Sequence, residues 1–143
     1  VRVIDRQFSD KHIALYQRYI RSRHPDGSMN VESKQEVEKF FLCNWSNTFF
    51  IEFLLNGTTI ALAVVDELES GLSAVYTFFE PAEEKRGLGV YAVLSLVEEA
   101  KRRQLPYVYL GYLIYENQKM SYKSRYRPLE QFHDGQWILI NNP

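Results

Sequence analysis

The sequence predicts an α/β domain built on a mixed sheet, an α+β arrangement in which helices pack on the strands. Two β-rich runs, 49–55 and 58–65, are separated by Asn56-Gly57, the pair that best accommodates the two positive φ angles of a tight hairpin. The segment 76–114 then reads as a strand, a glycine-containing turn, a helix and a second strand. A hairpin followed by such a unit predicts one sheet with a helical connection.

Composition narrows the class of protein. A length of 143 residues with 45% hydrophobic residues is that of one folded domain, 1–143. The single cysteine, Cys43, excludes an internal disulfide, and no Cys/His group has metal-ligand spacing, so we expect no metal here and a reducing, cytoplasmic compartment. No apolar run reaches membrane-spanning length, and a net charge of −1 argues against a general DNA or RNA binder. Because the chain opens without methionine or a signal segment, we expect a fragment of a longer protein.

The first part of the chain predicts a strand and two helices before the hairpin. A short strand over 1–4 leads to Ser9, which can cap a helix. The Pro- and Gly-containing stretch 24–27 should end that helix. Ser33 and Glu36, three residues apart, form a capping box for the second helix.

After the hairpin, the sequence predicts a third strand over 72–79 and then the turn 86–89, which opens a long helix. Apolar residues at helical spacing predict the buried face of that helix. They are Val90, Val93, Leu94, Val97 and Ala100.

The remaining elements are shorter. A strand over 107–114 contains Gly111, which indicates a bulge or a close approach to the backbone. The segment 117–126 reads as a short polar helix, and 137–140 as the last strand. Nothing in this stretch repeats an earlier segment or divides the domain.

The turn Arg86-Gly87-Leu88-Gly89 carries the first chemical signal. A glycine-rich turn before a helix leaves the first backbone N–H groups pointing outward, where the helix dipole adds partial positive charge. Such an end binds phosphates. Taken alone the motif is weak, and an ordinary helix start is the alternative.

Charged residues are unevenly distributed along the chain. Basic residues concentrate near the two ends, at Lys11, Arg18, Arg21, Arg23, Lys119, Lys123, Arg125 and Arg127. Acidic residues gather in the segments 32–38, 66–69 and 80–84. This distribution predicts one basic and one acidic face.

Several motifs carry a resemblance to known families. The order of strand, glycine turn, helix and strand resembles the GNAT acyltransferase superfamily, whose Arg-Gly-x-Gly turn holds the pyrophosphate of acyl-coenzyme A. Further motifs, in order along nearly the whole chain, strongly resemble the C-terminal domain of aminoacyl-tRNA–protein transferases. These motifs lie at 16–19, 23–29, 76–79, 88–91, 109–112 and 119–128.

That resemblance implies a GNAT-like fold and the transfer of an amino acid from a charged tRNA to a protein N-terminus. The run 26–29 and the ending Asp134-Gly135-x-Trp137 look like the bacterial aspartate/glutamate leucyltransferases, which mark proteins beginning with Asp or Glu for N-end-rule degradation. The family's cysteine-rich N-terminal region, associated with an iron–sulfur cluster or zinc, is absent from this chain. Gly87 stands where many members have serine, and glycine keeps the turn feasible.

The reaction joins an ester to an α-amine, so the protein must align the two and supply donors for the oxyanion. By resemblance to GNAT enzymes, backbone N–H groups of 77–79 would contact the carbonyl. Tyr76 or Tyr112 could donate a proton to the leaving hydroxyl, although buried tyrosines are usually part of a core. Aminoacyl-tRNA is the co-substrate, and we expect no cofactor in this domain.

Residues for tRNA and for the acceptor follow from the same reading. Phosphates of the tRNA 3′ end would contact the turn and a basic–aromatic segment in which a base could stack on a ring. The predicted donor-binding residues are Arg86, Gly87, Gly89, Lys119, Tyr122, Lys123 and Arg127. A solvated basic helix is the alternative reading of that segment. The predicted acceptor-binding residues are Arg18, Arg23 and His24.

Other functions remain open at this point. Arginine could be the transferred amino acid, since no motif specifies the pocket. A coenzyme A-dependent N-acetyltransferase would share the glycine turn but not need the basic–aromatic segments. A noncatalytic RNA-binding domain would need those segments but not the turn.

Overall fold

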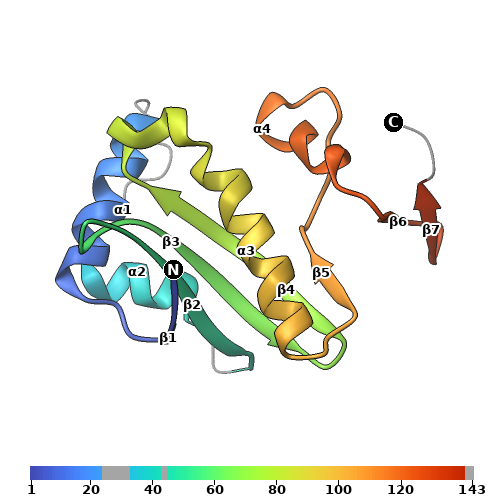
Figure 1. The fold of residues 1–143 in the computed structure, drawn as a ribbon, viewed down its shortest axis with the longest axis horizontal. Helices are drawn as coiled ribbons and strands as arrows, with labels where there is room; N and C mark the ends of the chain where they lie inside the picture. Colours follow the sequence, from blue (N-terminus) through green and yellow to red (C-terminus); the bar gives the residue numbers. More distant parts are fainter. Residues whose placement is uncertain (24–32, 43–44, 141–143) are drawn as a thin grey trace. The chain divides into compact units, whose positions relative to one another are not determined.

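The computed structural model describes residues 1–23, 33–42 and 45–140, which fall into two compact units, Val1–Tyr109 and Leu110–Pro143 (Figure 1). The first unit contains β1 (Arg2–Asp5), α1 (Asp10–Arg23), α2 (Lys34–Phe41), β2 (Asn47–Leu55), β3 (Thr58–Leu68), β4 (Gly71–Phe79), the 3-10 helix η1 (Pro81–Arg86), α3 (Leu88–Arg102) and β5 (Tyr107–Tyr109). The second contains α4 (Gln118–Ser121), η2 (Tyr122–Arg125), β6 (Leu129–His133) and β7 (Gln136–Ile140).

The five strands of the first unit form one mixed sheet in the order β1-β2-β3-β4-β5. All neighbours are antiparallel except β4 and β5, which are parallel. The predicted hairpin is confirmed, because β2 and β3 join through Asn56 and Gly57 at φ 50° and 81°. The predicted mixed α/β architecture is therefore confirmed.

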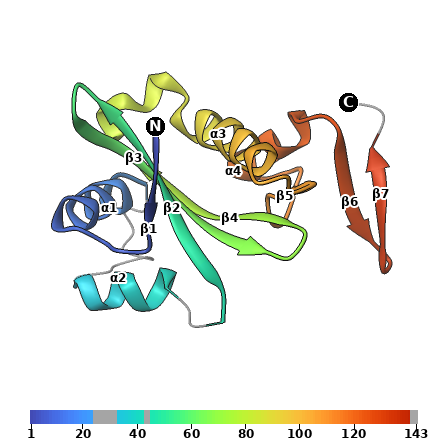
Figure 2. The same cartoon turned by 60° about the horizontal axis from the view of Figure 1, so that its bottom comes forward.

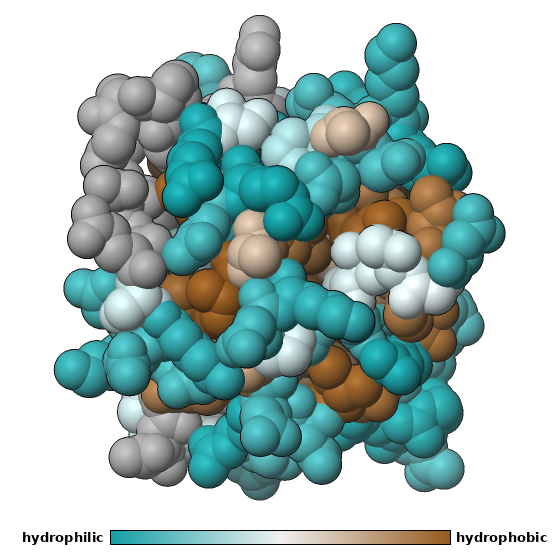
Figure 3. Space-filling model, turned by 90° about the vertical axis from the view of Figure 1, so that its left-hand side faces the viewer, coloured by the Kyte–Doolittle hydropathy of each residue, from teal (hydrophilic) through white to brown (hydrophobic). Residues whose placement is uncertain are grey.

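Helices cover both faces of this sheet, with α1 and α2 on one face and α3 on the other (Figures 1 and 2). One core gathers Phe8, Tyr16, Phe41, Phe50 and Phe78 between α1, α2 and the sheet. The second core lies under α3. The face seen in Figure 3 is mostly hydrophilic, with apolar surface in separate areas among polar side chains.

The N-termini of α1 and α2 are capped by the serines that the sequence predicts. Ser9 Oγ accepts the His12 N–H at 3.4 Å at the start of α1. Ser33 Oγ accepts the Glu36 N–H at 3.3 Å, while the Glu36 carboxylate accepts the Ser33 N–H at 3.0 Å, so the capping box is confirmed. The stretch 24–27 that should end α1 lies outside the described residues.

The predicted buried face of α3 is partly wrong. Val93 and Ala100 are buried, but Val90 and Leu94 are 47% and 49% exposed. The helix instead faces the sheet with a row spaced by four residues: Leu88, Ala92, Leu96 and Ala100. Apolar residues cover more than one face of this helix, so spacing alone did not identify the face that packs.

The predicted strand 107–114 is also shorter than expected. β5 ends at Tyr109, and Gly111 has a φ of 74°, a left-handed conformation that does not continue a strand. β5 therefore pairs with only the first three residues of β4, Gly71 to Ser73.

A bulge interrupts β4. Tyr76 pairs with Val64 and Ala74 with Val65, which leaves Val75 as the extra residue, 40% exposed.

In the second unit, the predicted helix 117–126 is divided into α4 and η2. The predicted strand 137–140 is confirmed within β7, which pairs with β6. β6 was not predicted from the sequence, although Asp134 and Gly135, at φ 47° and 82°, are a typical hairpin turn pair.

Candidate functional site

The unpaired edge of β4 is the first feature of the site. β3 pairs along β4 as far as Phe79, whereas β5 stops at Ser73. Within residues 1–109, as far as the structure describes them, no strand pairs with the other edge of β4 from Ala74 to Phe79. Alternate N–H and C=O groups on such an edge are available to an extended ligand. The segment 77–79, predicted to supply oxyanion donors, lies on this part of β4.

The glycine turn lies between η1 and α3. Gly87 has φ 64° and ψ 37°, and no side chain caps the N-terminus of α3. The Tyr91 N–H already donates to the Gly87 carbonyl at 3.0 Å, so the three preceding N–H groups are those without an intrahelical acceptor. A Cβ atom built on Gly89 would meet nothing within 4 Å. The helix end is therefore open to a ligand that approaches the backbone.

The acidic residues beside this turn are each paired with an arginine. Arg18 donates to one Glu80 oxygen through Nε at 3.0 Å and through an Nη at 2.8 Å. Arg86 Nε donates to Glu83. Arg23 Nη1 lies 3.9 Å from a Glu84 oxygen.

These pairs correct the expectation of separate basic and acidic faces, because arginines of α1 lie against the acids of 80–84. They also rank the predicted acceptor residues. Arg18 is held by two hydrogen bonds, whereas the Arg23 contact is long and its partner is 73% exposed. Arg23 is thus the less tightly paired of the two arginines. His24 lies outside the described residues.

Tyr76, a predicted catalytic residue, belongs to a tyrosine cluster between β4 and α1. Its ring centroid lies 6.3 Å from that of Tyr16 and 6.4 Å from that of Tyr19, both edge-to-face. The Arg23 guanidinium lies 5.9 Å from the centre of the Tyr19 ring. Burial raises the pKa of Tyr76, and the neighbouring tyrosines raise it further. The Tyr76 hydroxyl therefore stays protonated near neutral pH and can donate a hydrogen bond.

The other predicted catalytic residue, Tyr112, belongs to the second unit. Its side chain is 88% exposed, and its carbonyl accepts a hydrogen bond from Lys123 Nζ at 2.7 Å. Burial lowers the pKa of Lys123. The hydrogen bond to the Tyr112 carbonyl places Lys123 Nζ beside Gly111, where a Cβ atom added to the glycine would lie 3.9 Å from it.

The remaining predicted tRNA contacts also lie in this unit. Arg127 donates to the carbonyls of Ser124 and Tyr126, both at 2.6 Å. Tyr122 packs edge-to-face on Tyr126 at 6.3 Å. Lys119 is in α4, and its side chain is not among those described. Two predicted phosphate ligands, Lys123 and Arg127, are thus hydrogen-bonded to backbone carbonyls, which fixes where their charges lie.

Arg125 and Tyr16 were not among the residues predicted for the site. Arg125 is exposed and has no hydrogen bond or ion pair with the residues that the structure describes. The basic run 119–127 was a signal for Arg125. Tyr16 opens the motif 16–19, but aromatic residues at helical spacing usually belong to a core, so no role in the site was predicted for it.

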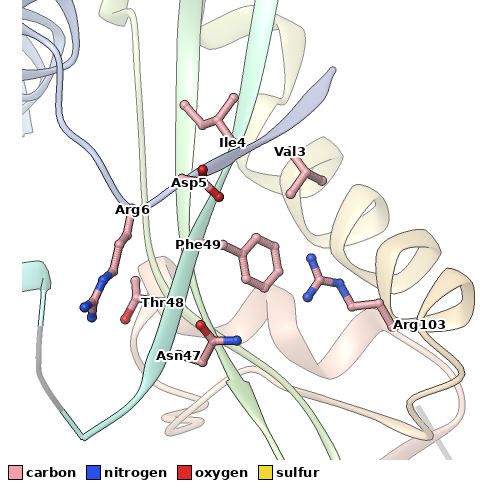
Figure 4. A pocket seen from close by; sticks show the side chains of 8 residues that line it. All are labelled: Val3, Ile4, Asp5, Arg6, Asn47, Thr48, Phe49 and Arg103. Carbon is pink, nitrogen blue, oxygen red and sulfur yellow. The ribbon is translucent and has the colours of Figure 1, made fainter.

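A cavity of about 680 Å³ lies elsewhere in the first unit, between the ends of β1 and β2 and the C-terminus of α3 (Figure 4). Arg103 lies over the Phe49 ring, 4.1 Å from its centre, and donates to Glu99 and Glu67. A helix rises 1.5 Å per residue, so this end of α3 is roughly 20 Å from the glycine turn. The cavity is therefore separate from the predicted site.

Within the described ranges, no three His, Cys, Asp or Glu side chains gather in a way that could hold a metal ion. Nor is any helix in that part of the chain long and apolar enough to cross a membrane.

An open strand edge beside an uncapped helix end is typical of α/β domains that bind an extended, anionic ligand. The model of the family described as "Arginine-tRNA-protein transferase, C terminus" matches residues 11–133, and the chain belongs to this family. The predicted resemblance is thus confirmed.

Curated relatives also support membership of the transferase family. The chain is 49% identical over 140 residues to an aspartate/glutamate leucyltransferase of Hahella chejuensis, covering 98% of the chain and 60% of the relative. Proteins of the same name from Marinobacter nauticus and Pseudomonas fluorescens are 45% and 46% identical, over 95% and 99% of the chain. The chain spans 57% and 60% of their lengths.

Proposed function

We propose that the protein carrying this chain transfers leucine from leucyl-tRNA to the α-amine of proteins that begin with Asp or Glu, marking them for N-end-rule degradation. The observation that carries this proposal is membership of the transferase family, together with relatives named for leucyl transfer. In this proposal the first unit is a GNAT-like acyltransferase fold, supported by the β4 edge that β5 leaves open and by the turn before α3. Because aminoacyl-tRNA serves translation, the reaction takes place in the cytoplasm.

The chemistry requires little activation of the nucleophile. An α-amine has a pKa near 8, so roughly a tenth is neutral at pH 7 and can attack the ester carbonyl. The tetrahedral intermediate then carries an oxyanion. Unpaired N–H groups in 77–79 are the proposed donors to that oxygen, because preorganised donors stabilise charge that develops in the transition state.

The leaving group is a ribose hydroxyl of the tRNA, which needs a proton as the intermediate collapses. Tyr76 is the proposed donor in the first unit, and its raised pKa keeps the proton in place until then. Tyr112, exposed in the second unit, is the alternative donor. The amine loses its proton to solvent or back to the tyrosine.

Donor binding involves two sets of residues. Gly87 and Gly89 leave the N-terminus of α3 open to phosphates of the tRNA 3′ end, with Arg86 beside them. In the second unit, the cations and rings at 119–127 bind the backbone and bases of the single-stranded end.

The basic segment gives a prediction about salt. Replacing Arg125 by alanine should lower the slope of log K against log salt concentration for leucyl-tRNA binding by about one, because one fewer phosphate is neutralised. Lys123→Ala should do the same if its ammonium reaches phosphate as well as the Tyr112 carbonyl. Lys101→Ala, an exposed cation of α3 paired with Glu98, is the control with no expected change. An unchanged slope in both Arg125→Ala and Lys123→Ala would contradict this interface.

The acceptor gives a second prediction. Peptides that begin with Asp should react about ten- to a hundredfold better than those beginning with Asn or Ala, since a partly desolvated arginine forms a charge-assisted contact of roughly 1.5–3 kcal/mol. Arg23 is the better candidate because its contact with Glu84 is long, while Arg18 is bound to Glu80. His24 is the third candidate.

Competition between the three peptides in a leucyl-transfer assay with the full-length protein tests this preference. Equal rates would exclude the acceptor assignment. A preference for Asp that persists in Arg23→Ala would move the recognition site away from Arg23.

The alternative donor is arginyl-tRNA, which the description of the matched family favours. An assay that offers leucyl-tRNA, arginyl-tRNA and acetyl-coenzyme A to the same peptide separates these reactions. Transfer of leucine alone supports the proposal. Transfer from acetyl-coenzyme A, or binding of tRNA without any transfer, would refute it.

A further inference from the structure

The hydroxyl of Tyr16 is buried without a hydrogen-bond partner. Tyr16 is 0% exposed in α1, and its Oη has no partner among the residues that the structure describes. Burying a hydroxyl without a partner costs folding free energy, because its hydrogen bonds to water are lost and not replaced. Phenylalanine at this position would keep the packing and avoid that cost. Among the described residues, the hydroxyl therefore gains no hydrogen bond that would stabilise this conformation.

Of the described rings that pack on Tyr16, one is polar. Tyr16 packs edge-to-face on Phe78 at 5.2 Å and on Phe41 at 5.4 Å, and neither can form a hydrogen bond through a side-chain oxygen. The third neighbouring ring is Tyr76, with centroids 6.3 Å apart. Tyr16 is among the groups that raise the pKa of Tyr76. A hydrogen bond from Tyr16 to Tyr76 requires the rings to move, because none forms in this arrangement.

We propose that Tyr16 is a positioning residue for Tyr76 in the transfer reaction. When both substrates are bound, the Tyr16 O–H donates to the Tyr76 oxygen, and this bond directs the Tyr76 O–H at the leaving ribose oxygen. The inference rests on the proposed function, in which Tyr76 protonates that oxygen. A hydrogen-bond chain of this kind strengthens each of its members in a dry interior.

The step is balanced in atoms and charge. The amine nitrogen forms a bond with the ester carbon, and the bond from that carbon to the ribose oxygen breaks. The ribose oxygen takes the Tyr76 proton, and the Tyr76 phenolate is stabilised by the hydrogen bond from Tyr16. The nitrogen, positively charged after attack, releases a proton that restores Tyr76. The products are an amide and a free ribose hydroxyl.

Tyr16→Phe tests the inference in the full-length protein with leucyl-tRNA and an Asp-initiated peptide. We expect kcat to fall about tenfold while KM for both substrates stays within about twofold, because a hydrogen bond made in the transition state is lost. The melting temperature should be equal to or above that of the wild type. Tyr107→Phe removes a hydroxyl from a 46% exposed ring of β5 and should leave both values unchanged.

A double-mutant cycle with Tyr76→Phe isolates the route of the effect. If Tyr16 acts through Tyr76, adding Tyr16→Phe to Tyr76→Phe should lower kcat no further. Full activity in Tyr16→Phe, or independent multiplication of the two losses, would overturn the inference. Wild-type protein that transfers no leucine would instead refute the proposed function, so the two failures are distinguishable.

Discussion

Replacing Glu52 by alanine is expected to destabilise the first unit by about 3–5 kcal/mol, because one partner of a buried charged network is removed. Glu52 is 2% exposed on β2 and accepts hydrogen bonds from Thr59 of β3, Arg2 of β1 and His12 of α1. Its carboxylate thus links three strands and a helix. Without it, the Nε2 atom of the 5% exposed His12 would lose its carboxylate partner.

The histidine is already fixed in one orientation. The Ser9 N–H donates to His12 Nδ1 at 3.2 Å, so the proton that faces Glu52 is on Nε2, 3.1 Å from the carboxylate. Denaturant unfolding of Glu52→Ala, with the exposed Glu69→Ala as control, measures the cost. A loss below about 1 kcal/mol would show that the network can be replaced by solvent.

Glu52 should also make stability depend on pH. Burial of the carboxyl raises its pKa, but the hydrogen bonds from Thr59, Arg2 and His12 outweigh burial and hold the pKa at about 2. A folded-state pKa below the ordinary value of about 4.3 means that the stabilisation is complete above about pH 5 and is lost as the pH falls toward 2. Glu52→Gln should therefore lose less stability than the wild type between about pH 5 and pH 3. Parallel curves for the two proteins would exclude this cause.

Gly89→Val is expected to lower leucyl transfer about ten- to a hundredfold while the protein stays folded, because one charge-assisted contact is worth roughly 1.5–3 kcal/mol. An added Cβ meets no protein atom within 4 Å, so the space it fills is the space proposed for donor phosphates. Gly89→Ala should even increase stability, by about 0.5–1 kcal/mol, since glycine is unfavourable within a helix. For alanine, stability and activity should change in opposite directions.

The control is Glu98→Val, which adds a β-branched residue at an exposed site of α3. Both variants are measured by thermal unfolding and by the KM for leucyl-tRNA. If folded Gly89→Val transferred leucine at the wild-type rate, the donor phosphates would not bind at this turn.

How much the sequence predicted depends on the range of the interactions involved. Asn56-Gly57 and Ser33 with Glu36 act within a few residues, and their hairpin and capping box were predicted correctly. The buried face of α3 was predicted only in part, because apolar residues lie on more than one face of the helix and tertiary packing buries Ala92 rather than Leu94. The strand predicted over 107–114 ends early, at Tyr109, and Gly111 has a left-handed conformation. The sequence indicated an irregularity at Gly111 but did not show that the strand would end before it.

In the candidate site, too, local features could be predicted from the sequence, whereas contacts between distant residues could not. The turn 86–89 has a local signature, and its position at the start of α3 could be predicted. The pairing of Arg18 with Glu80 joins residues that are 62 positions apart, so no local pattern indicated that this cation was engaged. The buried hydroxyl of Tyr16 also depends on packing between α1 and β4. The roles assigned to Tyr76, Tyr112 and the tRNA-binding residues stay predictions.

The bulge at Val75 has a consequence for solubility. An unpaired strand edge can be extended by a strand of another molecule, which is a common route to aggregation. Val75 interrupts the regular repeat of β4, so a foreign strand cannot stay in register along the whole open edge. The stretch from Tyr76 to Phe79 remains regular and lies near the short end of ordinary strand lengths. The bulge therefore shortens the part of the open edge along which a strand of another molecule could pair.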